Sequence, residues 1–343
     1  MTPIMNATDE KYGHWALVRD MLDTPNIIAK FNPNQATDVA AQIAEVGQLL
    51  LTGEGSSRIF PAKNAIAHAR RQGWPLALHT EAGRQSKEYD LAAWAVFALS
   101  NSGRTAEVIE LYQTLRERNH SHLFSLTAFP DSKLGSLAHR AFVLSCGPEG
   151  AVAATKSVIE QALFHRALLE QVAKQPALSS KLATLGEQFR QALTTTIPPE
   201  LIAKLTNART IYWAGRNDGV AEELTLKTNE ITRKRSDFLE GTYAVHGIEE
   251  VMDLSDVVIW IDPYAGSMAK FDDVLVKGVK LTVIAISSQP TPFSTILIPD
   301  AGDLSGFVQM AAGWNILVET GINLSINLDK PERARKVGNE FVG

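Results

Sequence analysis

Residues 94–105 read WAVFALSNSGRT, an apolar run followed at once by a turn rich in hydroxyl groups. A run of this kind, ended by serine and glycine, is typical of a buried parallel strand that leads into a helix. The same pattern occurs earlier, where LLLT at residues 49–52 is followed by GEGSS at residues 53–57. Helices are expected over 58–71 and 105–118, so these stretches predict repeated strand–helix units.

This strand–helix order runs through two successive blocks of the chain. The first block has further apolar runs at 75–79, 122–127 and 140–145 and a long helix expected over 152–172. The second block has strands expected at 210–215, 257–262, 280–286 and 294–299, and helices over 219–235, up to 279 and over 307–320. The pattern predicts an α/β protein with two domains, each a parallel sheet sandwiched by helices in a flavodoxin-like three-layer arrangement.

The expected domain boundaries follow from the same pattern. We expect an N-terminal helical segment over 1–45, a first α/β domain over 46–175, a helical connector over 176–207, and a second α/β domain with a C-terminal tail over 208–343. The length of 343 residues, with 45% apolar and 21% charged residues, gives two globular domains enough core and excludes a disordered chain.

Charge and cysteine content exclude several classes of partner. The net charge is −5 and the isoelectric point is about 5.9, so a nucleic-acid partner is not expected. The triplet Arg233-Lys234-Arg235 is flanked by acidic residues and is interpreted as the polar face of a helix. The single cysteine, Cys146, allows no disulfide within the chain and is expected to be a buried thiol at a strand end.

The first ten residues have neither the basic nor the apolar region of a signal peptide, and no apolar run has the length of a membrane span. We therefore expect a cytoplasmic protein with no membrane partner. No cluster of His, Asp and Glu with metal-ligand spacing occurs, so no metal or other cofactor is expected.

The turn at 100–105 carries the strongest chemical signal. Three hydroxyls, an amide and several backbone N–H groups are expected at a helix N-terminus, where an oxyanion finds donors and the positive end of the helix dipole. Helix capping alone would need fewer of these groups. The fingerprints of nucleotide-binding loops, GxxxxGK[ST] and GxGxxG, are absent, so a phosphorylated small molecule is favoured over a nucleotide.

A second signal is a row of charges in the second domain. Glu223, Lys227 and Glu230 are spaced i, i+4 and i+7, so they share one face of the expected helix. This spacing fits either a surface salt-bridge ladder or a carboxylate base held next to a cation.

Taken together, the motifs resemble the sugar isomerase (SIS) fold in tandem, as in the isomerase half of glucosamine-6-phosphate synthase and in stand-alone phosphosugar isomerases, deaminases and deglycases. The resemblance covers about residues 49–336. It rests on the turn at 54–57, the loop at 100–105, the EGAVAATK segment at 149–156, the ELTLKTNE helix at 223–230, His246-Gly247, and Asp329-Lys330-Pro331 with Lys336.

The resemblance implies roles for individual residues. Glu230 would be the base that moves a proton between C1 and C2, Lys227 would stabilise the resulting negative charge, and Lys336 would fold over the sugar. His246 would open the sugar ring from the neighbouring subunit of a homodimer. The residues implied in substrate or phosphate binding are Gly55, Ser56, Ser57, Ser100, Asn101, Ser102, Arg104, Thr105, Glu149 and Ala153.

The sequence also departs from the family pattern. No cysteine nucleophile lies near the start of the chain, so glutamine hydrolysis is not expected. The family's Gly-Glu-x-x-His-Gly-Pro is replaced by TYAVHGI at 242–248, which leaves the identity of the sugar open. Arg104 stands where the family has an acidic residue. Its charge would favour a dianion or another oxyanion such as a sulfonate, unless its side chain points to water.

The expected function is an enzyme that acts on a hexose 6-phosphate or a similar anionic sugar, as an aldose–ketose isomerase, an aminosugar-phosphate deaminase or a fructosyl-amine-phosphate deglycase. A non-catalytic sugar-phosphate sensor is the alternative. The presence of Glu230, Lys227, His246 and Lys336 favours catalysis, and no helix-turn-helix-like basic segment supports a repressor. A nucleotide-binding α/β protein is a third possibility, but the chain lacks its fingerprint.

Overall fold

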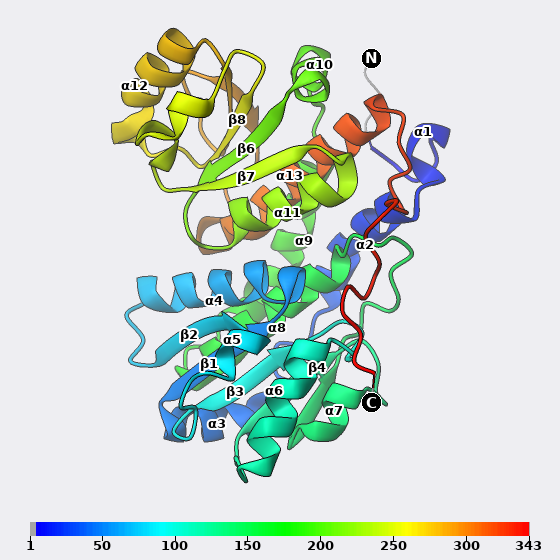
Figure 1. Ribbon diagram of the computed structural model, residues 1–343, viewed down its shortest axis with the longest axis vertical. Coiled ribbons are helices and arrows are strands. Elements are labelled where there is room, and N and C mark those ends of the chain that lie inside the picture. The colour runs from blue at the N-terminus through cyan, green and yellow to red at the C-terminus, as the bar shows by residue number, and fades with distance from the viewer. Residues whose placement is uncertain (1–4, 343) are drawn as a thin grey trace. The chain divides into compact units, whose positions relative to one another are not determined.

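The computed structural model describes residues 5–342, and the chain forms two compact units (Figure 1). One unit contains Asn26–Glu149, Ala154–Ala183 and the chain from Arg335 on. The other contains the chain up to Pro25, Gly150–Ala153 and Thr184–Ala334. Each unit holds one five-stranded sheet in which every pair of neighbouring strands is parallel.

The first sheet has the strand order β2-β1-β3-β4-β5. Its unit contains, in chain order, α3 (Thr37–Val46), β1 (Gln48–Gly53), the 3₁₀ turn η1 (Gly55–Ser57), α4 (Ile59–Arg71), β2 (Ala77–Ala82), α5 (Gly83–Ser86), β3 (Ala95–Leu99), α6 (Ala106–Glu117), β4 (Leu123–Thr127), α7 (Lys133–Leu137), β5 (Arg140–Val143) and α8 (Lys156–Val172).

Helices cover both faces of this sheet, and alternate residues of β3 show it. Val96 and Ala98 belong to the apolar cluster formed with α6. Phe97 points the other way, and its ring centroid lies 5.4 Å from that of Phe164 in α8. All five residues of β3 are buried. A strand buried on both faces reads as a continuous apolar run, which is why the sequence shows it so plainly.

The second sheet has the order β10-β9-β8-β6-β7. The remaining elements are α1 (Glu10–Gly13), α2 (Ala16–Lys30), α9 (Leu182–Leu193), α10 (Pro199–Asn207), β6 (Thr210–Gly215), α11 (Val220–Thr232), β7 (Arg235–Glu240), η3 (Tyr243–Val245), η4 (Ile248–Val251), β8 (Val257–Ile261), α12 (Met268–Phe271), the π-helical segment η6 (Asp272–Val279), β9 (Thr282–Ser287), β10 (Ser294–Leu297) and α13 (Ser305–Asn323).

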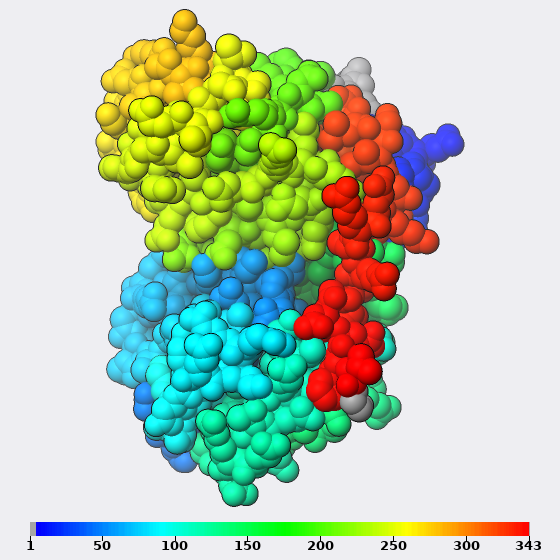
Figure 2. All heavy atoms as spheres, in the orientation of Figure 1, coloured from blue at the N-terminus to red at the C-terminus, as the bar shows by residue number. Residues whose placement is uncertain are grey.

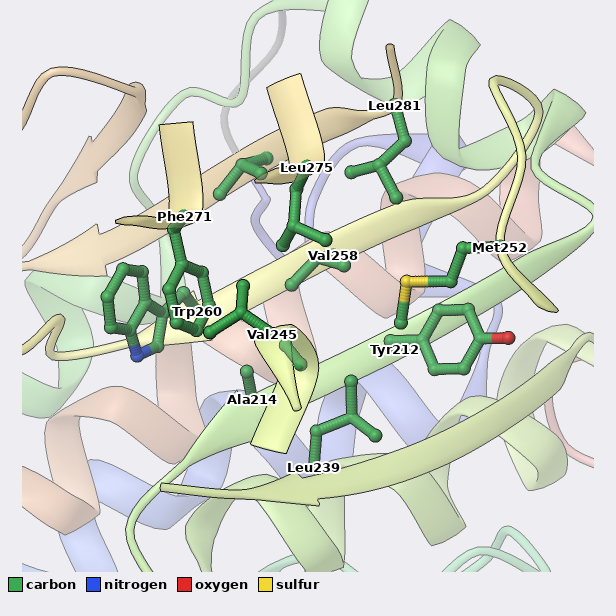
Figure 3. Packing of buried hydrophobic residues seen from close by; sticks show 12 residues of the cluster. Tyr212, Ala214, Leu239, Val245, Met252, Val258, Trp260, Phe271, Leu275 and Leu281 are labelled. Carbon is green, nitrogen blue, oxygen red and sulfur yellow. The ribbon is translucent and has the colours of Figure 1, made fainter. Parts of the chain in front are cut away.

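This sheet is also covered on both faces. Figure 3 shows Val258 and Trp260 of β8 packed with Phe271 and Leu275. The Trp260 and Phe271 rings stack with centroids 3.6 Å apart. On the other face, the Trp213 indole of β6 donates a hydrogen bond to Thr228 of α11.

Both sheets have the same topology when their strands are counted in chain order, 2-1-3-4-5, which is a common doubly wound order. The predicted α/β fold with two parallel sheets flanked by helices is therefore confirmed. In each sheet the order reverses between the first and third strands, which are β1 and β3 in one unit and β6 and β8 in the other.

One strand was missed. The helix expected over 219–235 ends at Thr232, Arg233 adopts a left-handed conformation with φ of 57°, and β7 begins at Arg235. The interpretation of the basic triplet as the polar face of a helix is therefore wrong. The Arg233 side chain donates to the carbonyls of Ile231 and Asn327, and Lys234 donates to that of Ala208. These cations satisfy carbonyl groups, including one in the last turn of α11.

Two further features bear on the sequence analysis. The Asp329 carboxylate accepts hydrogen bonds from the backbone N–H groups of Ala16 (3.0 Å) and Leu17 (2.8 Å), so it caps the N-terminus of α2. Cys146 is buried, as predicted, and burial raises the pKa of its thiol well above the ordinary value. Within residues 5–342, no helix is both long and apolar enough to cross a lipid bilayer.

Candidate functional site

The turns at 53–57 and 100–105 both lie where the first sheet offers a ligand site. They follow β1 and β3, which are hydrogen-bonded neighbours on either side of the point where the strand order reverses. Gly53 shows how closely they approach, because a Cβ atom there would lie 2.9 Å from the carbonyl oxygen of Leu99. The structure thus brings the two predicted turns together at the carboxyl edge of the sheet.

The loop at 100–105 is built by its own hydroxyl groups. The Ser100 and Thr105 hydroxyls lie 2.8 Å apart, and Ser100 also accepts a hydrogen bond from the Gly103 N–H. The Ser102 hydroxyl accepts from the Arg104 N–H. Thr105 is the N-cap of α6, yet its side chain makes no capping hydrogen bond to that helix. The hydroxyls therefore shape a curved loop at the helix N-terminus instead of only capping it.

Gly103 is required by this loop. Its φ is +64°, and a Cβ atom there would lie 2.3 Å from the Cβ of Ser132. Ser132 is itself fixed, because its hydroxyl lies 3.0 Å from that of Thr127 and accepts from the Gly135 N–H. The β4–α7 connection thus packs against the loop through Ser132. No local sequence pattern predicts this contact.

Glu149 is the centre of a hydrogen-bond network at the start of α8. One carboxylate oxygen accepts from the Thr155 and Ser157 N–H groups, and the other accepts from the Asn101 amide (3.0 Å) and the Lys336 ammonium (2.9 Å). Burial disfavours its charge, but Lys336 and the helix N–H donors outweigh that effect and hold the pKa of Glu149 below the ordinary carboxyl value. The network joins the predicted residues Asn101, Glu149 and Lys336.

Arg104 lies at the rim of this region. Its side chain is 57% exposed and forms an ion pair of 2.7 Å with Glu340, so it does not simply point to water. A pocket of about 470 Å³ adjoins it, lined by Ser102, Arg104, Phe129, Pro130, Asp131, Ser132 and Lys133. The pocket therefore has two cationic side chains and one carboxylate on its walls.

The other predicted turn contains Gly55, Ser56 and Ser57 as η1. The Ser57 hydroxyl accepts a hydrogen bond from the Gln161 amide of α8. The preceding Glu54 accepts from the Gly83 N–H (2.8 Å), and its half-buried position raises the pKa of its carboxyl. Glu54 thereby ties this turn to the end of β2.

In the other unit, α11 places three charges together as predicted. The Lys227 ammonium lies 2.6 Å from a carboxylate oxygen of Glu230 and 3.4 Å from one of Glu223. The side chains of Lys227 and Glu223 are fully buried, whereas that of Glu230 is 23% exposed. A solvated ladder would leave all three in water, so this is a buried cation with one carboxylate accessible from outside.

His246 lies in the exposed turn between η3 and η4, and its Nε2 atom is 3.2 Å from the Thr242 hydroxyl. Among the described residues it makes no hydrogen bond or ion pair with Glu230. Ala153 is buried, in the short segment 150–153 whose Val152 N–H donates to the Asp329 carbonyl. His246 therefore lies on an exposed turn and Ala153 in a buried segment.

Comparisons with known proteins agree with this fold. Residues 76–171 match the family model described as the SIS domain. The match is confined to that segment of the chain. The resemblance to the isomerase half of glucosamine-6-phosphate synthase is confirmed. The chain is 23% identical over 348 residues to a glutamine–fructose-6-phosphate aminotransferase (isomerizing) of Lactiplantibacillus plantarum, covering 93% of this chain and 57% of that relative. The chain thus spans little more than half the length of this relative.

Solved structures show the same fold. The C-terminal domain of glucosamine-fructose-6-phosphate aminotransferase from Francisella tularensis has a TM-score of 0.77 at 16% identity, covering 92% of this chain and 98% of that chain. A glucosamine-6-phosphate deaminase from Thermotoga maritima has a TM-score of 0.72 at 20% identity, covering 94% and 99%.

Proposed function

We propose that this protein is a SIS-domain enzyme that binds an anionic sugar, opens its ring and transfers a proton between C1 and C2. The substrate class is a hexose 6-phosphate or a sugar with a similar oxyanion. The loop at 100–105 supports this, because it presents hydroxyls and a helix N-terminus at the reversal point of a parallel sheet.

The observation that carries the proposal is the pairing of Lys227 with Glu230. Proton transfer in a sugar requires a base to break the C–H bond beside the carbonyl, and the electron pair then moves onto the carbonyl oxygen as an enediolate. Glu230 is a partly exposed carboxylate, suited to take that proton and return it to the neighbouring carbon. Lys227 is a buried ammonium 2.6 Å away, suited to stabilise negative charge in a site of low polarity.

Two further groups complete the proposed mechanism. His246 would act as the acid and base that opens the ring, since an imidazole can both donate and accept a proton. Lys336, held by Glu149, would approach the sugar from the C-terminal tail. We also propose a cytoplasmic homodimer in which His246 serves the site of the partner subunit.

The same enolisation leads to different products according to the substituent on the sugar. Without an amine the result is an aldose–ketose isomerisation, and with an amine it ends in loss of ammonia or of an amino acid. The relatives named above include both an isomerizing aminotransferase and a deaminase. These names support the class of reaction and leave the substituent to experiment.

The test is deuterium exchange into sugar phosphates, followed by NMR in deuterium oxide. The panel contains fructose 6-phosphate, glucosamine 6-phosphate, galactosamine 6-phosphate and fructosyl-amino-acid phosphates, each with a 6-sulfonate analogue where one exists. We expect deuterium at C1 or C2 of at least one of these sugars. Glu230→Gln should abolish the exchange and preserve binding of the same sugar. Glu200→Gln on the exposed surface of α10 is the matched control and should exchange as the unaltered chain does.

Binding of a panel sugar without any exchange would contradict the proposal and would favour a sensor. Exchange at the unaltered rate in the Glu230→Gln variant would contradict the role given to that carboxylate. A panel sugar that exchanges equally well with and without its phosphate would contradict the role given to the loop at 100–105.

A further inference from the structure

The end of the chain forms a short strap on the loop at 100–105. Thr105 and Glu340 make an antiparallel β-bridge, the Ala106 N–H donates to the Asn339 carbonyl (3.0 Å), and the Phe341 N–H donates to the Arg104 carbonyl (2.9 Å). We call residues 339–341 the strap. In Figure 2 the end of the chain, in red, lies on the surface of the unit that contains the first sheet.

Side chains of the strap reinforce these backbone contacts. The Asn339 amide donates to the Glu107 carboxylate (2.8 Å), and the Phe341 ring packs against the apolar cluster of β1, β3 and α6. The backbone hydrogen bonds and Phe341 would hold the strap in place without any charge. The Glu340 carboxylate is therefore not needed merely to dock the strap.

What the Glu340 carboxylate does is neutralise Arg104. Its oxygen lies 2.7 Å from the Arg104 guanidinium, which with Ser102 lines the 470 Å³ pocket beside the loop. The Asn339 carbonyl also occupies the N–H of Ala106, the first residue of α6. The strap thus occupies two hydrogen-bond donors, the Arg104 guanidinium and the Ala106 N–H, that could otherwise bind an oxyanion at this loop.

We propose that Glu340 is an internal competitor of the ligand's anion for Arg104, and that it sets the affinity and anion selectivity of the loop. This inference rests on the anion-binding role given to the loop under the proposed function. When an oxyanion binds beside Ser102, it takes the guanidinium from Glu340 and the side-chain link of the strap to Arg104 is broken. A ligand with greater negative charge competes better, so the pair favours dianions over monoanions.

Lys336 lies close to the same loop. It precedes the strap by three residues and reaches Glu149, the buried carboxylate that also accepts from Asn101 of the loop. The backbone hydrogen bonds of the strap hold this segment in place whether or not Arg104 is paired with Glu340.

The test measures binding of inorganic phosphate by calorimetry at low ionic strength, where exposed charges are least screened. Glu340→Gln keeps the shape of the side chain and the backbone bridge but removes the charge. Because both partners of the pair are about half exposed, we expect phosphate to bind about two- to fivefold more tightly to this variant. Glu332→Gln removes the same charge elsewhere in the tail, and phosphate should bind to it as to the unaltered chain.

The assignment of Arg104 is tested by the double variant. In an Arg104→Gln background, Glu340→Gln should change phosphate affinity by less than half of its effect in the unaltered chain. Affinity for sulfate should rise as it does for phosphate in the single variant, and affinity for acetate should rise more, because a monoanion competes less well with Glu340.

Unchanged or weaker phosphate binding by Glu340→Gln would overturn the inference, because a purely structural carboxylate gives that result. An equal gain in the Arg104→Gln background would also overturn it, because the effect would then be a general one of net charge. Absence of phosphate binding in every variant overturns it as well. The proposed function is tested separately by deuterium exchange into sugars, so its failure can be distinguished from the failure of this inference.

Discussion

The ammonium group of Lys227 lies 2.6 Å from the carboxylate of Glu230, one helical turn further along α11. Lys227 is fully buried and Glu230 is not, so the pair joins a buried positive charge to a partly exposed carboxylate. Glu223, also fully buried, lies 3.4 Å from the same ammonium group. The helix therefore holds one buried cation between a partly exposed carboxylate and a buried one.

The three charges should contribute unequally to stability. Lys227→Met leaves the buried Glu223 carboxylate without this cation, and breaking a buried ion pair costs about 3–5 kcal/mol. Glu230→Gln should cost about 1 kcal/mol or less, because its carboxylate is partly solvated. Urea unfolding followed by tryptophan fluorescence, to which Trp213 beside α11 contributes, measures both. Equal stability of the two variants would contradict the buried ion pair.

Gly103→Ala should disable the loop at 100–105. The new methyl group meets the Ser132 side chain at 2.3 Å, and the positive φ adds strain. Gly147→Ala is the matched control, since its φ is +71° and a Cβ atom there meets nothing within 4 Å. We expect Gly103→Ala to lose about 1–3 kcal/mol more than the control, which is the usual cost of overpacking, and to lose phosphate affinity. Equal losses in the two variants, measured by urea unfolding, would show that the contact with Ser132 does not matter.

The stability of the first-sheet unit should depend on acid pH through Glu149. The pKa of Glu149 is lower in the folded chain than in the unfolded chain, so its contribution is complete above the ordinary carboxyl value of about 4.3. That contribution is lost as the pH falls from there through the folded pKa, because over this range the unfolded chain binds the proton more readily than the folded chain does. Urea unfolding between pH 7 and pH 3 should show this loss in the unaltered chain.

A second variant tests the cause of that pH dependence. Lys336→Gln removes a cation that lowers the pKa of Glu149 in the folded chain, so the loss of stability should be smaller and should end at a higher pH. Glu149→Gln should lack this part of the pH dependence altogether. Identical acid profiles for all three chains would show that Glu149 does not hold its charge as described.

Asp329 should act as a helix cap that lies far away in the sequence. Asp329→Ala removes the acceptor for the Ala16 and Leu17 N–H groups, and loss of a cap costs about 0.5–2 kcal/mol. Asp329→Asn keeps one acceptor oxygen without the charge, so its stability should lie between those of the unaltered chain and Asp329→Ala. Hydrogen exchange of α2 should quicken in the same order. Faster exchange in Asp329→Asn than in Asp329→Ala would contradict the capping role.

The parts of this structure that could be predicted are those that depend on local sequence patterns. The apolar run at 95–99 predicted β3 because both faces of that strand are buried. The spacing of Glu223, Lys227 and Glu230 predicted a shared helix face because the helical repeat alone decides it. The turns at 53–57 and 100–105 were brought together by a property of parallel sheets in general.

Features that depend on long-range contacts could not be predicted in this way. β7 lies at the edge of its sheet and alternates exposed with partly buried residues, so it continued the polar pattern of α11. The residue that ends that helix, Arg233, has a positive φ without being a glycine and gives no stop signal. The pairing of Glu340 with Arg104 joins residues far apart in the chain, and only the folded tail reveals it.

The chain passes between its two compact units after Pro25, after Glu149, after Ala153, after Ala183 and after Ala334. Neither unit is therefore formed by one continuous segment of the sequence. A fragment cut at the middle of the sequence would separate α1 and the first part of α2 from the unit to which they belong, and Lys336 and the strap from theirs. During synthesis, neither unit can be complete before Ala334 has been added to the chain.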